Sequence, residues 1–293
     1  MSFLSHVISG LSLGSIYAII ALGYTMVYGI AKMLNFAHGD VIMIGAYVCF
    51  FALTRAGLHP LIGIVLSMII CTVLGMAIER FAYKPLRQAP SLAVLITAIG
   101  MSYLLQNTAQ LLWSPNTKVF PSIVGNGSIK LFDGQLSISY VTVVTVAVCI
   151  VVMVVLSVFT GNTKMGKAMR ACSEDKGAAQ LMGINVNTTI SMTFAIGSAL
   201  AAIAGVLLCS AYPIFSPTVG SMPGIKAFTA AVFGGIGSIP GAFVGGLLLG
   251  VIEIMAAAYI STEISDAVVF LVLIIVLLVK PTGLLGKKIS EKV

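Results

Sequence analysis

The sequence contains several apolar runs that reach the length of a membrane-crossing helix. An α-helix needs about 20 consecutive apolar residues to cross about 30 Å of hydrocarbon. Hydrophobic residues make up 59% of the 293 residues and the mean hydropathy is +1.09, far more than the core of a water-soluble domain requires. The runs lack the alternation typical of barrel strands. We therefore expect an integral membrane protein whose residues 1–293 form a single transmembrane domain.

The predicted fold class is an all-α polytopic membrane protein, a helical bundle of about eight or nine transmembrane segments that include short or broken helices. The first apolar run is expected to stay in the protein, because MSFLSH carries no basic residue that would mark a cleavable signal. The expected spans are 6–30, 39–54, 60–79, 91–113, 139–160, 188–212, a short one at 225–237, 241–260 and 266–280.

Lysine and arginine residues are distributed unevenly across this bundle. With nine crossings, twelve of the 16 lie on one side, and only Arg55, Lys118, Lys130 and Lys226 lie on the other. Cytoplasmic loops carry the excess of such residues, so we expect the amino terminus outside and the carboxyl terminus in the cytoplasm. The short segment 225–237 must then cross, because otherwise the cations of the tail would lie outside.

The only sizeable external feature expected is the loop 114–139. Its alternating residues SIKLFDGQLSIS predict a small hairpin with a turn at Asp133-Gly134. Such a loop is either a docking surface for an external partner or a solvated connector.

The cytoplasmic loop 162–187 contains the charged stretch GKAMRACSEDKGAAQLMGI, residues 166–184. Ser173 is the expected N-cap of a helix of about nine residues, and Gly183 the residue that follows its end. Ala178, Leu181 and Met182 would share one face of it. The helix is either a connector or a docking element for another protein.

The same loop contains GNTKMGK, which matches a phosphate-binding loop up to its last letter. The next residue is Ala168, where the pattern needs Ser or Thr for magnesium, and a membrane span precedes the motif instead of a strand. We expect no ATP site and no other cofactor on this chain. No metal site is expected either, because the five cysteines are scattered and form no CxxC pair.

Polar residues interrupt the expected spans at a few positions. The break NFAHGD contributes Asn35, His38 and Asp40, which could line a pathway or form a tight cytoplasmic turn. A central acidic residue facing lipid costs about 2.5–3.5 kcal/mol, so the polar side chains inside spans should face the bundle interior or an aqueous path. Those residues are Ser102, Gln106, Gln110 and Glu253. Hydrogen bonding between helices is the alternative role for the two glutamines.

Small residues recur at helical spacing in two late segments. The segment 234–246, GGIGSIPGAFVGG, is broken by Pro240, and it lacks the third glycine and the strand of a dinucleotide site. The G-x-x-x-G spacing instead predicts close helix packing. The residues expected to pack in this way are Gly197, Ala201, Gly205, Gly241, Gly245, Gly246 and Gly250.

Taken together, these segments resemble a known family. The loop 166–184, with the following NVNTTISMTFAIGSALAAIAGVL, resembles the Glu-Ala-Ala coupling region of bacterial ABC importer permeases, although its spacing departs from E-A-A-x-x-x-G. Nearly the whole chain is similar to LivH-type permeases of branched-chain amino acid importers (the LivHM family). The segments that carry the similarity are SGLSLGSIYAIIALGYTMVYGIAKMLNFAHGDVIMIGAY, KAFTAAVFGGIGSIPGAFVGGLLLGVIE and LLVKPTGLLG.

The resemblance implies a permease without enzymatic activity, of the many-helix type found for vitamin B12 and ribose, in the bacterial inner membrane. It implies a LivM-like second permease chain, two cytoplasmic ATPases that use ATP and Mg, and an external binding protein that carries most of the specificity. No nucleic acid is expected to bind. The residues implied in coupling to the ATPase are Arg170, Glu174, Asp175, Gly177, Ala178, Ala179, Leu181, Met182 and Gly183.

Two other classes compete with this interpretation. A passive channel or an ion-driven carrier for a small polar solute would also be a helical bundle, and Asn35-Phe36-Ala37 faintly resembles the Asn-Pro-Ala turn of aquaporins. However, the proline is missing and no second copy occurs. A membrane-embedded enzyme is the third class, but no catalytic pair or His cluster is visible.

Overall fold

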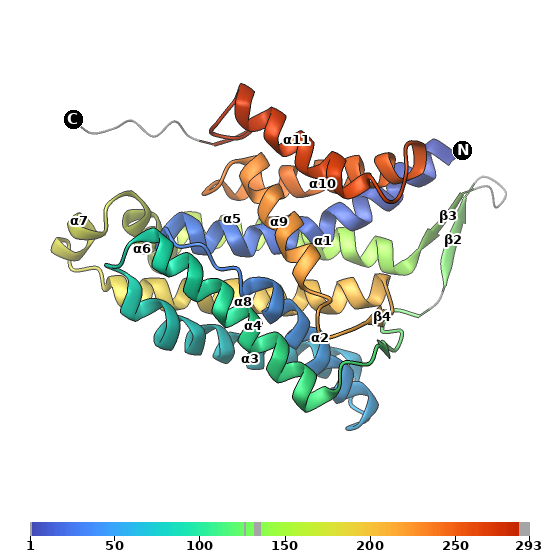
Figure 1. The fold of residues 1–293 in the computed structure, drawn as a ribbon, viewed down its shortest axis with the longest axis horizontal. Coiled ribbons are helices and arrows are strands. Elements are labelled where there is room, and N and C mark those ends of the chain that lie inside the picture. Colours follow the sequence, from blue (N-terminus) through green and yellow to red (C-terminus); the bar gives the residue numbers. More distant parts are fainter. Residues whose placement is uncertain (1, 126, 132–135, 287–293) are drawn as a thin grey trace.

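The computed structural model describes residues 2–125, 127–131 and 136–286, and this part of the chain is a bundle of long helices with a few short strands (Figure 1). A π-helical turn (Glu79–Tyr83) and a 3-10 turn (Lys84–Leu86) extend the third helix. The helices are α1 (Ser2–Ala31), α2 (His38–Thr54), α3 (Pro60–Ile78), α4 (Ser91–Trp113), α5 (Tyr140–Asn162), α6 (Lys164–Glu174), α7 (Lys176–Leu181), α8 (Val186–Ala211), α9 (Ser221–Gly234), α10 (Ile239–Tyr259) and α11 (Ser265–Val279).

The long helices confirm the all-α polytopic fold class. Within the described residues, six helices are long and apolar enough to cross a membrane. The apolar helices α2 and α11 are shorter, with 17 and 15 residues, and α9 has 14. Each of the nine expected spans coincides with one of these helices to within a few residues.

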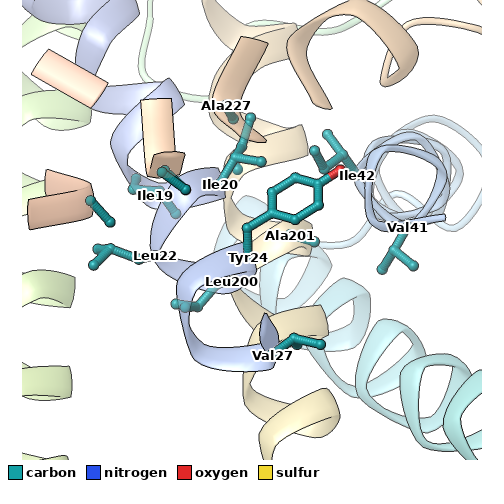
Figure 2. Packing of buried hydrophobic residues seen from close by; sticks show 14 of the residues in the cluster. Ile19, Ile20, Leu22, Tyr24, Val27, Val41, Ile42, Leu200, Ala201 and Ala227 are labelled. Carbon is teal, nitrogen blue, oxygen red and sulfur yellow. The ribbon is translucent and has the colours of Figure 1, made fainter. Parts of the chain in front are cut away.

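Two helices form the centre of the bundle. In the most apolar 18-residue stretch of α1 and of α8, 78% of the residues are buried. The corresponding fractions for α3, α4 and α5 are 28%, 22% and 17%. Figure 2 shows Tyr24 of α1 among Ile20, Ile42 and Ala227, side chains that come from three different helices. The peripheral helices direct apolar side chains outward, as helices that face lipid do.

The two ends of the bundle differ in structure. At one end lie the N-terminus and the antiparallel strands β2 (Ser128–Leu131) and β3 (Leu136–Ser139); at the other lie α6 and α7 (Figure 1). The expected turn Asp133-Gly134 lies outside the described residues. A second strand pair joins β1 (Lys118–Val119) to β4 (Ile214–Phe215).

The small-residue stripes lie at helix contacts. Gly241 and Gly245 face α9, while Gly246 and Gly250 face α1 at Ala18 and Gly14. On α8, Gly197 contacts α1 and Gly205 contacts α2, and Ala201 is fully buried between them. The close approach of these backbones fixes the positions of α1 and α2, which carry the polar residues described below.

Candidate functional site: a surface hairpin and a buried polar cluster

The loop 162–187, which the sequence predicts to be cytoplasmic, folds as a hairpin of two short helices, α6 and α7. Thr163 caps α6, because its hydroxyl accepts a hydrogen bond of 3.0 Å from the Gly166 amide. A Cβ atom at Gly166 would lie 2.2 Å from the Phe159 carbonyl oxygen, so the tight turn from α5 into α6 requires glycine there. The hairpin is thus held directly against the end of a membrane span.

The expected N-cap of this region was wrong. Ser173 lies in the last turn of α6, where its hydroxyl donates to the Arg170 carbonyl oxygen. The N-cap of α7 is Asp175, whose Oδ1 accepts from the amides of Gly177 at 2.8 Å and Ala178 at 3.0 Å. Asp175 holds this position because its backbone is extended (φ −154°), which breaks the helix after Glu174. As a result α7 has six residues rather than about nine.

The far end of α7 follows the sequence pattern. Gly183 has φ +81°, the left-handed conformation expected after a helix end. Leu181 and Met182 are 90% and 82% exposed, and Ala178 is exposed as well. Two large apolar side chains therefore project from the tip of the hairpin, as they would at a surface that another protein covers.

The opposite side of the hairpin packs against α1. Met169, Cys172 and Ala179 are buried in one cluster with Met26 and Ile30 of α1. Burial raises the pKa of the Cys172 thiol. Arg170, by contrast, is exposed and donates to the Gly161 carbonyl oxygen at 3.0 Å, so it fastens α6 to the end of α5.

Lys176 makes a polar contact between α7 and α1. Its Nζ donates a hydrogen bond of 2.7 Å to the carbonyl oxygen of Ala31, the last residue of α1. Partial burial, followed by the charges of Arg87 and Lys32, lowers the pKa of this lysine. The hairpin is therefore attached to the point where α1 ends and the irregular segment 32–37 begins.

The segment 32–37 leads into a buried polar cluster at the start of α2. Lys32 turns the chain with φ +58°. Asn35 is buried, and its Oδ1 accepts a hydrogen bond of 3.0 Å from the Tyr83 hydroxyl. His38 is 1% exposed, with its ring 4.6 Å from that of Tyr24.

Asp40 joins this segment to α4 and α9. Gln106 Nε2 donates to Asp40 Oδ1 at 2.9 Å and also lies 3.2 Å from the hydroxyls of Ser102 and Ser221. Four side chains from three helices thus meet, and we call Asp40, Ser102, Gln106 and Ser221 the Asp40 cluster. Three of the expected pathway residues, Asp40, Ser102 and Gln106, come together in this cluster. Asn35 and His38 lie in the segment that immediately precedes Asp40.

Two expected pathway residues lie elsewhere. Gln110 is half-buried and makes no side-chain hydrogen bond within the described part of the chain. Glu253 Oε1 accepts from Lys226 Nζ at 2.8 Å, and the same nitrogen lies 2.6 Å from Asp266 Oδ1. The structure therefore places Glu253 in an ion-pair network that joins α9, α10 and α11.

Sequence reasoning missed Ser221, Tyr83 and the role of Lys226. Lys226, counted above among the four cations expected on the external side, is only 7% exposed and lies inside α9. A lone lysine in an apolar helix predicts a buried counterion, and that signal was available. No comparable signal marks Ser221 or Tyr83.

The fold is that of a polytopic membrane protein with an irregular, polar break between its first two helices. The chain matches, over residues 6–277, the family described as branched-chain amino acid transport system, permease component. It belongs to that family.

Individual relatives cover nearly the whole chain. It is 48% identical to the LivH permease protein of a high-affinity branched-chain amino acid transport system from Salmonella typhimurium, over 99% of this chain and 98% of the relative. It is 46% identical to BraD of the same kind of system from Pseudomonas aeruginosa, with the same coverage. A chain in the solved structure of PsaBC from Streptococcus pneumoniae in complex with Fab has a TM-score of 0.50 at 14% identity, covering 96% of this chain and 93% of that one. This last likeness concerns the fold alone.

Proposed function

We propose that this chain is the transmembrane permease subunit of an ATP-driven ABC importer that moves branched-chain amino acids into the cytoplasm. Full-length similarity to LivH and BraD supports the substrate class. The observation that carries the ATP-driven mechanism is the α6–α7 hairpin, which exposes Leu181 and Met182 while its other side packs on α1. A surface of this kind suits a partner that pushes on the bundle.

The chain works with other subunits in this proposal. A second, LivM-like permease chain completes the transmembrane unit, two ATPases bind ATP and Mg on the cytoplasmic side, and a binding protein delivers substrate outside. The hairpin end faces the cytoplasm and the β2–β3 end faces outward, so the amino terminus is external and the carboxyl terminus cytoplasmic. The excess of lysine and arginine on the hairpin side supports this orientation in the inner membrane.

Coupling in this proposal passes through the residues of the 166–184 loop. The exposed residues Glu174, Gly177, Ala178, Leu181, Met182 and Gly183 contact the ATPase. Asp175, Arg170 and Ala179 instead hold the hairpin in shape, through a helix cap, a contact to α5 and packing on α1. Substrate passes the break at Asn35 and His38 and the Asp40 cluster.

The double substitution Leu181→Glu, Met182→Glu tests the coupling role. Two charges in an apolar contact should abolish co-purification of the ATPase and ATP-dependent uptake, while the thermal unfolding midpoint stays unchanged because both residues are exposed. Gln180→Glu, on the same helix and also exposed, is the matched control and should leave both intact. If the doubly substituted permease still binds and responds to its ATPase, α7 is not the coupling helix.

A further inference from the structure

We propose that the Asp40 cluster binds the ammonium group of the amino acid in transit, with Asp40 Oδ2 as its charged acceptor. This inference rests on the proposed function and names the chemistry by which the bundle receives its substrate. A zwitterion inside a membrane protein needs a partner for each of its charges. The cluster supplies a partner for the positive one.

In the described part of the chain, Asp40 lacks the cationic partner that the buried Glu79 and the largely buried Glu253 have. Glu79 is paired with Arg87, and Glu253 with Lys226. Asp40 is 1% exposed, its Oδ1 is held by the neutral amide of Gln106, and its buried Oδ2 has no hydrogen-bond partner within the described residues. A buried carboxylate is costly unless it is paired with a cation, and Oδ2 is available to bind one.

The helix dipole at Asp40 does not replace a cationic partner. It lies in the first turn of α2, where the positive end of the helix dipole favours an acidic residue. The dipole lowers the cost of the charge, but it leaves Oδ2 without a hydrogen bond. A bound cation would satisfy the charge and the open acceptor together.

The neighbours of Asp40 match an ammonium group better than a metal ion. A primary ammonium carries three N–H donors and no acceptor. The cluster offers Asp40 Oδ2 and the hydroxyl oxygens of Ser102 and Ser221, both of which lie 3.2 Å from Gln106 Nε2. One carboxylate oxygen and two hydroxyls thus provide one acceptor for each donor. No group of three His, Cys, Asp or Glu residues that could hold a metal occurs in the part of the chain that the structure describes.

A close contact between two glycines adjoins the cluster. A Cβ atom at Gly39 would lie 2.6 Å from the Gly220 carbonyl oxygen, so α2 and the start of α9 meet backbone to backbone. Asp40 directly follows Gly39 in the sequence, and Ser221 directly follows Gly220. The cluster therefore adjoins the contact between α2 and the start of α9, and in this proposal substrate reaches the cluster when that contact opens.

Thermal unfolding of the purified permease–ATPase complex without binding protein tests the inference. The ligands are leucine, isoamylamine (an ammonium without a carboxylate), isocaproate (a carboxylate without an ammonium), choline (a cation without N–H donors) and sodium chloride. Leucine and isoamylamine should raise the unfolding midpoint, whereas isocaproate, choline and sodium should not. In Asp40→Asn the apparent affinity for both amines should fall about ten- to hundredfold, the usual range for losing a hydrogen bond to a charged group.

Two further variants keep the test informative if Asp40→Asn fails to fold. Ser221→Ala removes one acceptor and should weaken amine binding several-fold. Asn107→Ala is the matched control, because Asn107 is exposed beside Gln106 and bonds only to the Tyr103 carbonyl oxygen among the described residues. It should bind amines as the unmodified protein does.

Three results would overturn the inference: no shift with amines, equal shifts in Asp40→Asn and the unmodified protein, or equal shifts with sodium or choline. Each of these would leave ATP-dependent leucine uptake untouched. If uptake by the unmodified importer did not depend on ATP, the proposed function would be rejected, regardless of how amines shift the unfolding midpoint.

Discussion

Lys176 of α7 donates a 2.7 Å hydrogen bond to the carbonyl oxygen of Ala31 and thereby closes the carboxyl end of α1. The last carbonyl groups of a helix have no amide partner within it, and a cation there is also favoured by the helix dipole. Ala31 immediately precedes the break that leads to Asn35 and Asp40. One side chain therefore connects the proposed ATPase-binding hairpin to the proposed substrate path.

Lys176→Met should uncouple the two regions. The ATPase should still bind, because Leu181 and Met182 are untouched, but uptake per ATP hydrolysed should fall several-fold. Loss of this charged hydrogen bond should also lower the free energy of unfolding by about 1–3 kcal/mol. Uptake and ATP hydrolysis measured in the same proteoliposomes give the ratio.

Lys167→Met is the control for that experiment, since Lys167 is an exposed lysine on α6. The ratio should be unchanged in this variant. Equal ratios for Lys176→Met and Lys167→Met would show that the contact with Ala31 carries no coupling.

Glu253→Gln should destabilise the bundle rather than alter substrate handling. The side chains of Lys226 and Glu253 are 9% and 12% exposed, and breaking a buried ion pair costs at most about 3–5 kcal/mol, a cost that the remaining contact of Lys226 with Asp266 reduces. Asp266 is 44% exposed, so Asp266→Asn should cost less. Thermal unfolding of both variants gives the order, and unchanged stability of Glu253→Gln combined with lost uptake would point back to a substrate role.

Gly250→Val should prevent close packing of α10 on α1. A Cβ atom at Gly250 would lie 2.2 Å from the Gly14 backbone nitrogen, so the two helices must move apart. Overpacking of this kind costs about 1–3 kcal/mol or more. Gly100→Ala is the control, because nothing lies near that position. Yields of folded protein after detergent extraction would be compared, and equal yields would contradict the packing described here.

The spans were predictable because their length and apolar composition depend on local sequence alone. Gly183 was predictable for the same reason, since few residues other than glycine adopt φ near +81°. The choice between Ser173 and Asp175 as N-cap was not, because both residue types cap helices well and the outcome depends on where α6 ends. From the sequence we expected a single helix in this loop, whereas the structure has two, α6 and α7.

The candidate site depended on contacts between residues distant in sequence. Asp40 and Gln106 were each singled out as polar residues in apolar surroundings, but their pairing is a property of the packed bundle. Glu253 was singled out for the same reason, and only the packing of α9 against α10 shows that Lys226 neutralises it. Local pattern identifies which polar residues need partners, and the three-dimensional structure determines which partners they have.

Leucine uptake into proteoliposomes that contain this chain, its related permease chain and their ATPase tests the central claim most directly. With binding protein and leucine outside and ATP inside, uptake should proceed, and it should stop when ATP is replaced by a non-hydrolysable analogue. Uptake that continues without ATP, or that follows a sodium or proton gradient instead, would contradict the account and identify a channel or an ion-driven carrier.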